Sequence, residues 1–251
     1  PQQDKNVTVK GDLGQSAAGK TDKNGELTVP EVEQTERHGV YIVGYTDGTF
    51  GPSRSMTRSE AAAIFARLLA EKNGDTISTA ANTKFADIPA HAWYSGYVKY
   101  LSNNGITYGK SKTIFAPNDA ITRAEFTTMA VRFFDVYGDG DAEIMEQFSG
   151  FNDVSSGYWA AEYIKYAALH GWINGYGDGS FHADREINRA EVVTIVNRLL
   201  GREADEDYIA DNLRKLNTFP DVSRKHWAYY AVMEAANAHT AVLGESESWS
   251  K

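Results

Sequence analysis

Three arginines stand in the same short context along this chain of 251 residues. Arg58, Arg123 and Arg189 lie in Thr-Arg-Ser-Glu, Thr-Arg-Ala-Glu and Asn-Arg-Ala-Glu, spaced 65 and 66 residues apart. Thr or Asn followed three residues later by Glu is typical of a capping box, which begins a helix. The arginine is left unexplained, because a cation in the first turn opposes the helix dipole by roughly 0.3–1 kcal/mol. Each arginine therefore needs a structural carboxylate or an anionic ligand, and free amides at the helix N-terminus would favour a bound carboxylate.

A second motif repeats an aspartate and a tryptophan. In each copy Phe-x-Asp is followed by Trp six residues after the Asp, giving the pairs Asp87 and Trp93, Asp153 and Trp159, and Asp221 and Trp227. A Trp that opens an amphipathic helix is expected in the core, although it can also offer its flat face to a sugar ring. The Asp is expected to cap that helix or the turn before it, with pairing to a motif arginine as the alternative.

The elements that position these residues follow from the repeat. After each arginine, apolar residues fall at i, i+3, i+4, i+7 and i+8, which predicts an amphipathic helix. Each Trp motif predicts a second helix, with Val98, Ile164 and Val232 facing inward. Turns of the type Gly-Tyr-x-Asp-Gly join the two helices, because Asp-Gly adopts positive φ readily. The middle turn, residues 109–113, has lost the Tyr, the Asp and the second Gly.

The order of the motifs predicts a closed arrangement. The first repeat lacks its front half and the chain ends with an unpaired front half, so we expect the helix near Trp227 to pack on the N-terminal unit near Arg58. The expected fold is mainly α, with three helical modules in a pseudo-threefold arrangement. The segments are residues 1–39, a linker or the end of a preceding domain with short strands; 40–84, the second half of module 1; 85–150, module 2; 151–218, module 3 with a charged helical connector from 201; and 219–251, a half-module that packs on module 1.

Composition narrows the classes of function. The formal net charge is −9 and no basic block interrupts it, which disfavours nucleic-acid binding. The absence of cysteine excludes disulfides, thiol catalysis and cysteine-ligated zinc, and suits an exported bacterial protein. No apolar run approaches 18 residues, so no membrane insertion is expected.

An enzyme and a calcium protein are the rival classes. No Ser-His-Asp signature or phosphate-binding Gly-rich loop is present, and the six histidines have no metal-ligand spacing, so neither catalysis nor a cofactor is expected. One acidic stretch partly matches an EF-hand loop, with a poor ligand, Tyr137, at its third position. A solvated loop is the favoured interpretation there and calcium is the alternative; the candidate ligands are Asp135, Asp139, Asp141 and Glu146.

Together, "FPDVSRKHWA", "GYTDGTFGP" and "ITRAE" resemble the motifs of the S-layer homology domain, in three copies over roughly residues 40–240. The resemblance implies an extracellular module whose helices form a pseudo-trimer. Such modules hold exported proteins non-covalently on bacterial cell walls by binding secondary cell-wall polysaccharide, in which the recognised sugar is typically a pyruvylated N-acetylmannosamine. S-layer neighbours would be further partners. A surface protein–protein interaction module, or the C-terminal anchor of an extracellular glycan-active enzyme, is the alternative.

The resemblance also assigns roles by matched position. Arg58, Arg123 and Arg189 would grip the pyruvyl carboxylate, and Trp93, Trp159 and Trp227 would line the sugar groove. Asp87, Asp153 and Asp221 would orient the arginine or accept sugar hydroxyls, and Gly44, Tyr45, Gly175 and Tyr176 would supply turn contacts. The groove that uses residues 109–113 is expected to be altered or silent, and the sequence leaves open whether Arg123 faces an intact or a degenerate turn.

Overall fold

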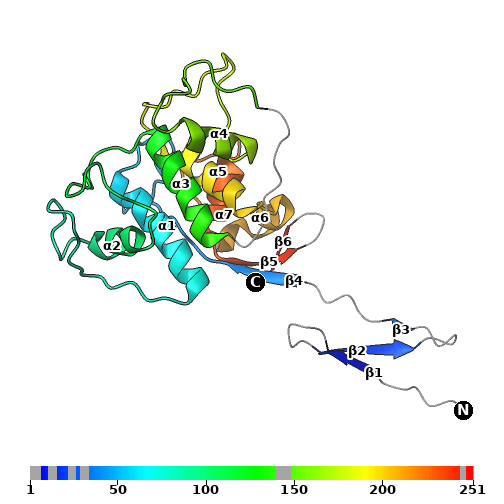
Figure 1. The fold of residues 1–251 in the computed structure, drawn as a ribbon. Helices are drawn as coiled ribbons and strands as arrows, with labels where there is room; N and C mark the ends of the chain where they lie inside the picture. Colours follow the sequence, from blue (N-terminus) through cyan, green and yellow to red (C-terminus); the bar gives the residue numbers. More distant parts are fainter. Residues whose placement is uncertain are drawn as a thin grey trace, which may run out of the picture.

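The structure is a computed structural model that describes residues 34–138, 148–243 and 247–250, together with three short strands before them. These strands, β1 (Val7–Lys10), β2 (Ser16–Thr21) and β3 (Leu27–Thr28), form an antiparallel sheet in that order (Figure 1). Short strands are predicted in "KNVTVKG" and "GELTVPEV", which contain β1 and β3, whereas no sequence pattern predicts β2.

Three helices begin at the motif arginines, as the capping boxes predict. They are α1 (Arg58–Asn73), α3 (Arg123–Tyr137) and α5 (Arg189–Leu200). In each, the side chain of Thr or Asn accepts from the glutamate amide, and the glutamate carboxylate accepts from the cap amide. Their apolar faces meet in the core, where the ring of Phe65 lies 5.3 Å from that of Phe126 and 4.9 Å from that of Phe133.

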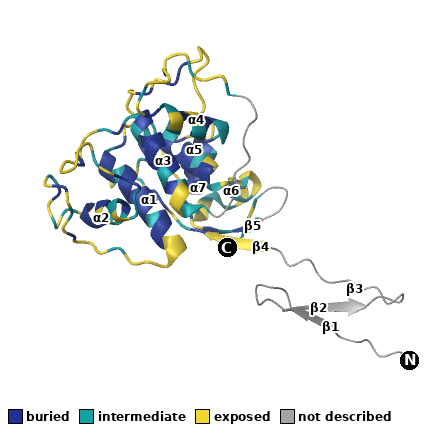
Figure 2. Cartoon of the chain, in the orientation of Figure 1, coloured by how far each residue is buried: buried dark blue, intermediate teal, exposed yellow. Residues whose placement is uncertain are grey.

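The Trp motifs lead into three shorter helices, α2 (Ser95–Asn103), α4 (Ala161–Leu169) and α7 (Tyr229–Ala236). Val98, Ile164 and Val232 are all buried, which confirms the predicted inward face. Each short helix packs on the arginine helix that precedes it in the chain, so that α2 lies on α1, α4 on α3 and α7 on α5 (Figure 1). The exposed faces of the body are formed mainly by the turns and by the outer sides of these short helices (Figure 2).

A cycle of backbone hydrogen bonds joins the three repeats just before the arginine helices. Met56 N donates to Ile187 O at 3.0 Å, Ile187 N donates to Ile121 O at 3.0 Å, and Ile121 N donates to Met56 O at 2.9 Å. All three side chains are fully buried. The starts of α1, α3 and α5 are therefore fixed against one another by the main chain as well as by side-chain packing.

The C-terminal half-repeat completes the first turn of the body. Asp221 accepts from the amides of Phe50 and Gly51, and the ring of Phe219 lies 5.3 Å from that of Phe50. Gly44 allows this approach, since a Cβ at Gly44 would lie 2.5 Å from the Phe219 ring. Helix α7 packs on α5, and its Ala235 carbonyl accepts from the amide of Tyr41 at 3.3 Å, so α7 also contacts the start of the N-terminal unit.

Two further features lie at the ends of the body. The charged connector forms α6 (Glu206–Asn212) and a 3-10 turn, η1 (Leu213–Lys215), so the predicted helix is confirmed. Strands β4 (Gln34–His38), β5 (His239–Leu243) and β6 (Ser248–Ser250) form an antiparallel sheet that the sequence did not predict, in which His38 lies opposite His239. Among the helices of the described residues, none has the length and apolarity needed to cross a bilayer.

Candidate functional site

Each motif arginine is buried and holds the main chain of another repeat. Its Nε donates to a phenylalanine carbonyl at 2.8–2.9 Å, and its guanidinium lies 4.5–5.0 Å from the same ring. The exposed fraction is 4% for all three arginines. The pairs are Arg58 with Phe115, Arg123 with Phe181, and Arg189 with Phe50. The arginine therefore has a structural role that capping did not explain.

A protein carboxylate also lies beside each arginine. Nη1 of Arg58 is 3.2 Å from Glu125, and Nη1 of Arg123 is 3.1 Å from Glu191. Each of these glutamates belongs to the capping box of the next arginine helix, so one side chain both caps a helix and neutralises a buried cation. Burial lowers the pKa of Arg189, while Tyr45 and Glu60 oppose that effect. Of the two partners that the sequence left open, the structural carboxylate is present.

The first amides of the arginine helices are not free to bind an anion. Arg58 N donates to Asp119 O and Ser59 N donates to Pro117 O, both at 3.0 Å. The equivalent amides of α3 and α5 donate to carbonyls of residues 185, 183, 54 and 52. The expectation of an anion site made by free helix amides is therefore wrong, and a ligand in this region has to be recognised by side chains.

The motif aspartates clamp the same turns. Each carboxylate accepts from the amide of the phenylalanine whose carbonyl the arginine holds, and from the next amide, with shortest distances of 2.6–2.9 Å. The three contacts are Asp87 with Phe115 and Ala116, Asp153 with Phe181 and His182, and Asp221 with Phe50 and Gly51. The described short helices have no side-chain hydrogen bond at their N-caps, so the aspartates do not cap them.

The three motif tryptophans are exposed, contrary to the core position that we expected. The exposed fraction is 54% for Trp93, 57% for Trp159 and 65% for Trp227. A large aromatic ring that is more than half exposed contributes little to the core, but its face is open to a partner. The alternative interpretation, a flat surface for a sugar ring, is the one that this geometry favours.

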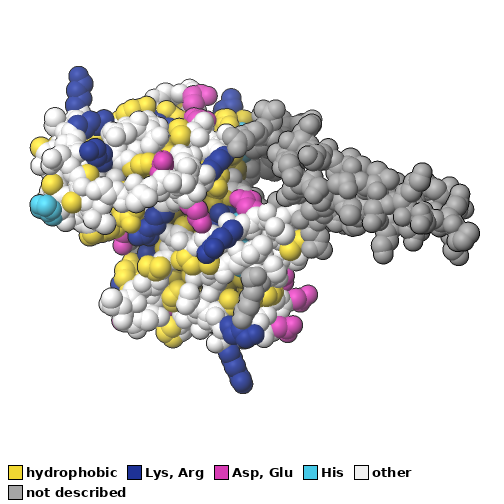
Figure 3. Space-filling model, turned by 90° about the horizontal axis from the view of Figure 1, so that it is seen from below, with side chains coloured by type: hydrophobic (Ala, Val, Ile, Leu, Met, Phe, Trp, Pro, Cys, Tyr) yellow, Lys and Arg dark blue, Asp and Glu magenta, His cyan; other side chains and the backbone are white. Residues whose placement is uncertain are grey.

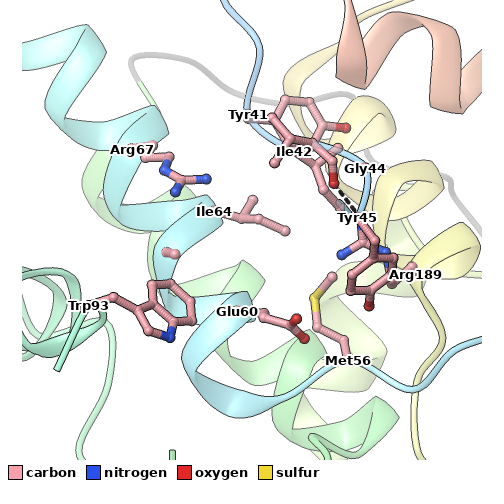
Figure 4. Close-up of a pocket in the computed structure, with 12 residues that line it drawn as sticks. Tyr41, Ile42, Gly44, Tyr45, Met56, Glu60, Ile64, Arg67, Trp93 and Arg189 are labelled. Carbon is pink, nitrogen blue, oxygen red and sulfur yellow. Dashed lines mark hydrogen bonds between the residues drawn. The ribbon is translucent and has the colours of Figure 1, made fainter. Parts of the chain in front are cut away.

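Trp93 is one wall of a cavity of about 230 Å³ that also contains Tyr45 and Arg189. Figure 4 shows Trp93 and Arg67 on one side, Tyr45 and Arg189 on the other, and Glu60 at the base. The residues come from different repeats, because the turn follows β4, Trp93 precedes α2 and Arg189 begins α5. Gly44 lines the same cavity. We call this cavity groove A.

A second cavity, of about 280 Å³, repeats the arrangement. Arg123 takes the place of Arg189, Gly175 and Tyr176 that of the first turn, and Trp227 that of Trp93. We call it groove B. The fold thus brings together two sets of the residues predicted from the sequence, each with an arginine, a Gly-Tyr turn and an exposed tryptophan. Both volumes are slightly below those of ordinary drug-sized pockets, which suits a single sugar ring.

The degenerate turn faces Arg58, because Arg58 holds Phe115 at the end of that turn. Arg123 faces the intact turn at residues 175–179, so the question that the sequence left open is answered. The third position differs in charge as well. Lys110 pairs with Asp119 at 2.9 Å, whereas the other two copies have an arginine where Asp119 stands.

Five further arginines at repeated positions were missed by the sequence reasoning, and two of them line the grooves. Nine residues after each motif arginine stands another, and Arg67 and Arg198 line grooves A and B, respectively. Four residues before two of the motif arginines stand Arg54 and Arg185, which lie over the rings of Tyr45 and Tyr176. The fixed offsets of these arginines from the motif arginines are the sequence signal that could have identified them. The fifth arginine is Arg132, whose guanidinium lies over the rings of Tyr108 and Tyr163. On the face drawn in Figure 3, Lys and Arg side chains lie among apolar ones, although the chain is acidic.

Of the four candidate calcium ligands, Asp139, Asp141 and Glu146 lie outside the described residues, and Asp135 is exposed on α3. His38 and His239, 201 residues apart in sequence, have ring nitrogens 3.2 Å apart, a proximity that their spacing in the sequence does not indicate. Pairing of β4 with β5 brings them together.

Known proteins share this sequence pattern. The family model described as the S-layer homology domain matches residues 28–62, 84–127 and 150–193. The chain is 34% identical over 218 residues to "Cell surface glycoprotein 1" of Acetivibrio thermocellus, covering 84% of this chain and 9% of that protein. It is 30% identical over 233 residues to the "Cellulosome-anchoring protein" of the same organism, covering 92% of this chain and 49% of the relative. It is 32% identical over 163 residues to the "Surface-layer 125 kDa protein" of Lysinibacillus sphaericus, covering 63% of this chain and 13% of that protein. The chain thus spans at most about half the length of these relatives.

Proposed function

Because the chain belongs to the S-layer homology domain family, we propose that it anchors an exported protein non-covalently by binding pyruvylated secondary cell-wall polysaccharide in grooves A and B. The module is extracellular, lies at the bacterial cell surface and is an anchor rather than a catalyst. Relatives named for surface layers and for cellulosome anchoring support this role. The polysaccharide and any S-layer neighbours are the partners that the proposal implies.

The observation that carries the proposal is the repetition of one set of side chains in two grooves. In groove A, the face of Trp93 is exposed for a sugar ring, and Arg67 and Arg189 approach from opposite sides. A pyruvate ketal carries one carboxylate next to a sugar ring, which matches an aromatic face beside two guanidinium groups. Groove B offers Trp227, Arg123 and Arg198 in the same relation.

The motif arginine forms the floor of its groove rather than a mobile arm. Its Nε and one Nη are already held by carbonyls in both grooves, as Arg189 is by Phe50 and Val43. Such a guanidinium is pre-organised, so binding costs little side-chain entropy. The second arginine, Arg67 or Arg198, completes the carboxylate site from the opposite wall.

The third position is proposed to bind weakly or not at all. Its turn, residues 109–113, lacks the tyrosine that the other two turns place under an arginine. Asp119 adds a negative charge where Arg54 and Arg185 add positive ones. Both changes disfavour an anionic ligand, so two working grooves per chain are proposed.

The same proposal includes the architecture. The cycle of hydrogen bonds through Met56, Ile121 and Ile187 supports a closed pseudo-threefold arrangement of three modules. The module boundaries near residues 84, 150 and 218 are part of it. In this arrangement, each groove draws on different repeats, so the grooves form only when the three repeats fold together.

Sedimentation with purified cell walls tests the proposal. The chain is expected to sediment with walls that carry the pyruvylated polysaccharide and to remain in solution after the pyruvyl groups are removed by mild acid. A wall preparation that is re-pyruvylated should recover binding. Equal sedimentation with both preparations would instead favour a surface protein–protein interaction and would overturn the carboxylate-based proposal.

A further inference from the structure

Four ionisable side chains converge in the interior at the place where the two ends of the body meet. His38 ends β4, Glu234 lies on α7, His239 begins β5 and Glu247 precedes β6. His38, Glu234 and His239 are buried, and the side chain of Glu247 is 5% exposed. None of the four lines groove A or groove B.

Five distances among these side chains are close to the edge lengths of a tetrahedral metal site, with Glu234 facing the two histidines through different oxygens, and one ligand atom from each residue lies within 4.8 Å of the others. Nδ1 of His38 lies 3.2 Å from Nε2 of His239 and 3.3 Å from a carboxylate oxygen of each of the two glutamates. Nε2 of His239 lies 3.3 Å from Glu234 and 3.2 Å from Glu247. Four ligands placed about 2.0–2.1 Å from a central zinc ion are roughly 3.3–3.4 Å from one another.

Glu234 lacks the hydrogen bonds that a buried carboxylate requires. Neither of its oxygens accepts a hydrogen bond from any group among the described residues, although its side chain is fully buried. An uncompensated carboxylate in the interior is strongly destabilising. Both oxygens point toward the ring nitrogens of His38 and His239, so a cation at the centre would satisfy them.

The surrounding contacts orient the ligands as in known metal sites. Nδ1 of His239 is 2.9 Å from the carbonyl oxygen of Asn237 and donates to it, which leaves the lone pair of Nε2 directed at the cluster. Nε1 of Trp249 donates to one oxygen of Glu247, and the amide of Glu203 donates to the other. The Trp249 ring also stacks on that of His239, with centroids 3.8 Å apart.

We propose that His38, Glu234, His239 and Glu247 bind one structural zinc ion. Two imidazoles and two carboxylates fill all four positions, which is the pattern of a structural rather than a catalytic zinc site. Calcium and magnesium are disfavoured, because they prefer a larger set of oxygen ligands. The ion would fasten β4 to α7 and to its sheet neighbours β5 and β6, and so join the two ends of the body.

Two carboxylates face two imidazoles at this centre, so a cation held there would offset the negative charge of Glu234 and Glu247. A proton shared among the four groups is the competing occupant, and the experiment below separates the two.

The test uses the full chain, stripped with a chelator and then titrated with zinc. We expect about one zinc ion per chain by elemental analysis, a rise in the thermal midpoint with added zinc, and no rise with calcium or magnesium. Cobalt in place of zinc is expected to give the intense visible absorption of a four-coordinate site. Unchanged stability together with no bound zinc or cobalt would overturn the proposal and leave the proton-shared cluster.

Substitutions of the proposed ligands test where the zinc ion binds. His239→Gln and Glu234→Gln are expected to weaken zinc binding at least about 10-fold. Glu36→Gln is the matched control, because Glu36 is an exposed carboxylate 3.9 Å from the outer nitrogen of His38 and should leave binding unchanged. Equal zinc affinity in all three variants would place the ion elsewhere and overturn the assignment. Should a ligand variant fail to fold, the cobalt spectrum of the unmodified chain still decides.

Discussion

At the scale of single residues, each turn peptide is held from two sides. An aspartate binds the amide of the turn phenylalanine and an arginine from another repeat binds its carbonyl, as Asp87 and Arg58 do for Phe115. The arginine thus serves the fold and, in the proposal, also forms the floor of a groove. Arg58 is expected to keep only the structural role, because it faces the degenerate turn at residues 109–113.

Replacing Arg58 with Ala should therefore lower stability with little loss of wall binding. The substitution leaves Phe115 O and Glu125 without their buried partner, which costs about 1–3 kcal/mol. The same change at Arg123 or Arg189 should lower both stability and binding. Urea unfolding and wall sedimentation measure the two effects, and a strong binding defect in folded Arg58→Ala would contradict the assignment of the silent groove.

The exposed tryptophans allow a cleaner test of binding. Trp227→Ala should weaken polysaccharide binding by about 1 kcal/mol if a sugar ring packs on its face, the lower end of the range known for bases stacked on aromatic side chains. Its stability should hardly change, because the ring is 65% exposed. Trp159→Ala is the matched control, with a similarly exposed ring at the degenerate position, and should bind normally. An equal loss in both variants would argue against two unequal classes of groove.

The motif aspartates predict how the fold responds to acid. Burial raises the pKa of Asp221, but hydrogen bonds from Phe50 and Gly51 outweigh it and lower the pKa below its ordinary value of 3.8. The stabilisation is therefore complete above that ordinary value and is lost as the pH falls through the lowered one. Asp221→Asn should be less stable than the unmodified chain near neutral pH, and the difference should shrink below about pH 4. Parallel curves of unfolding free energy against pH would show that Asp221 is not responsible.

At the scale of elements, local sequence signals predicted the arginine helices well. The capping boxes located the first residues of α1, α3 and α5, because cap and first turn are determined by four neighbouring residues. The sheet of β4, β5 and β6 was not predictable in that way. Its strands are short, and β4 pairs with residues of β5 about 200 positions away, so the sheet depends on tertiary packing.

The repeat itself supplies a test of the caps. Thr122→Ala should cost about 1 kcal/mol, because the amide of Glu125 loses its acceptor. Thr122→Asn should be nearly neutral, since Asn188 performs the same role at the start of α5. Denaturant midpoints of the two variants give the comparison. A neutral Thr122→Ala would mean that packing alone fixes the start of α3.

At the scale of the whole molecule, the chain ends are brought together. Residues 219–221 contact the turn that begins the body, while α7 covers α5. The motif arginine, the Gly-Tyr turn and the tryptophan of each groove were predictable from the motifs, whereas Arg67, Arg198 and the grouping of these residues were not. Which turn faces which arginine depends on the direction in which the repeats follow one another, and motif spacing does not contain that direction. The cluster around His38 escaped detection for the same reason, since its ligands come from both ends of the chain.

Isothermal titration with a synthetic glycoside of pyruvylated N-acetylmannosamine tests the central proposal most directly. Two grooves with matching residues predict about two ligands bound per chain. The same sugar without the pyruvyl group should bind at least about 10-fold more weakly, because the carboxylate loses its arginine partners. Equal affinity for the two sugars, or no measurable binding of either, would contradict the proposal.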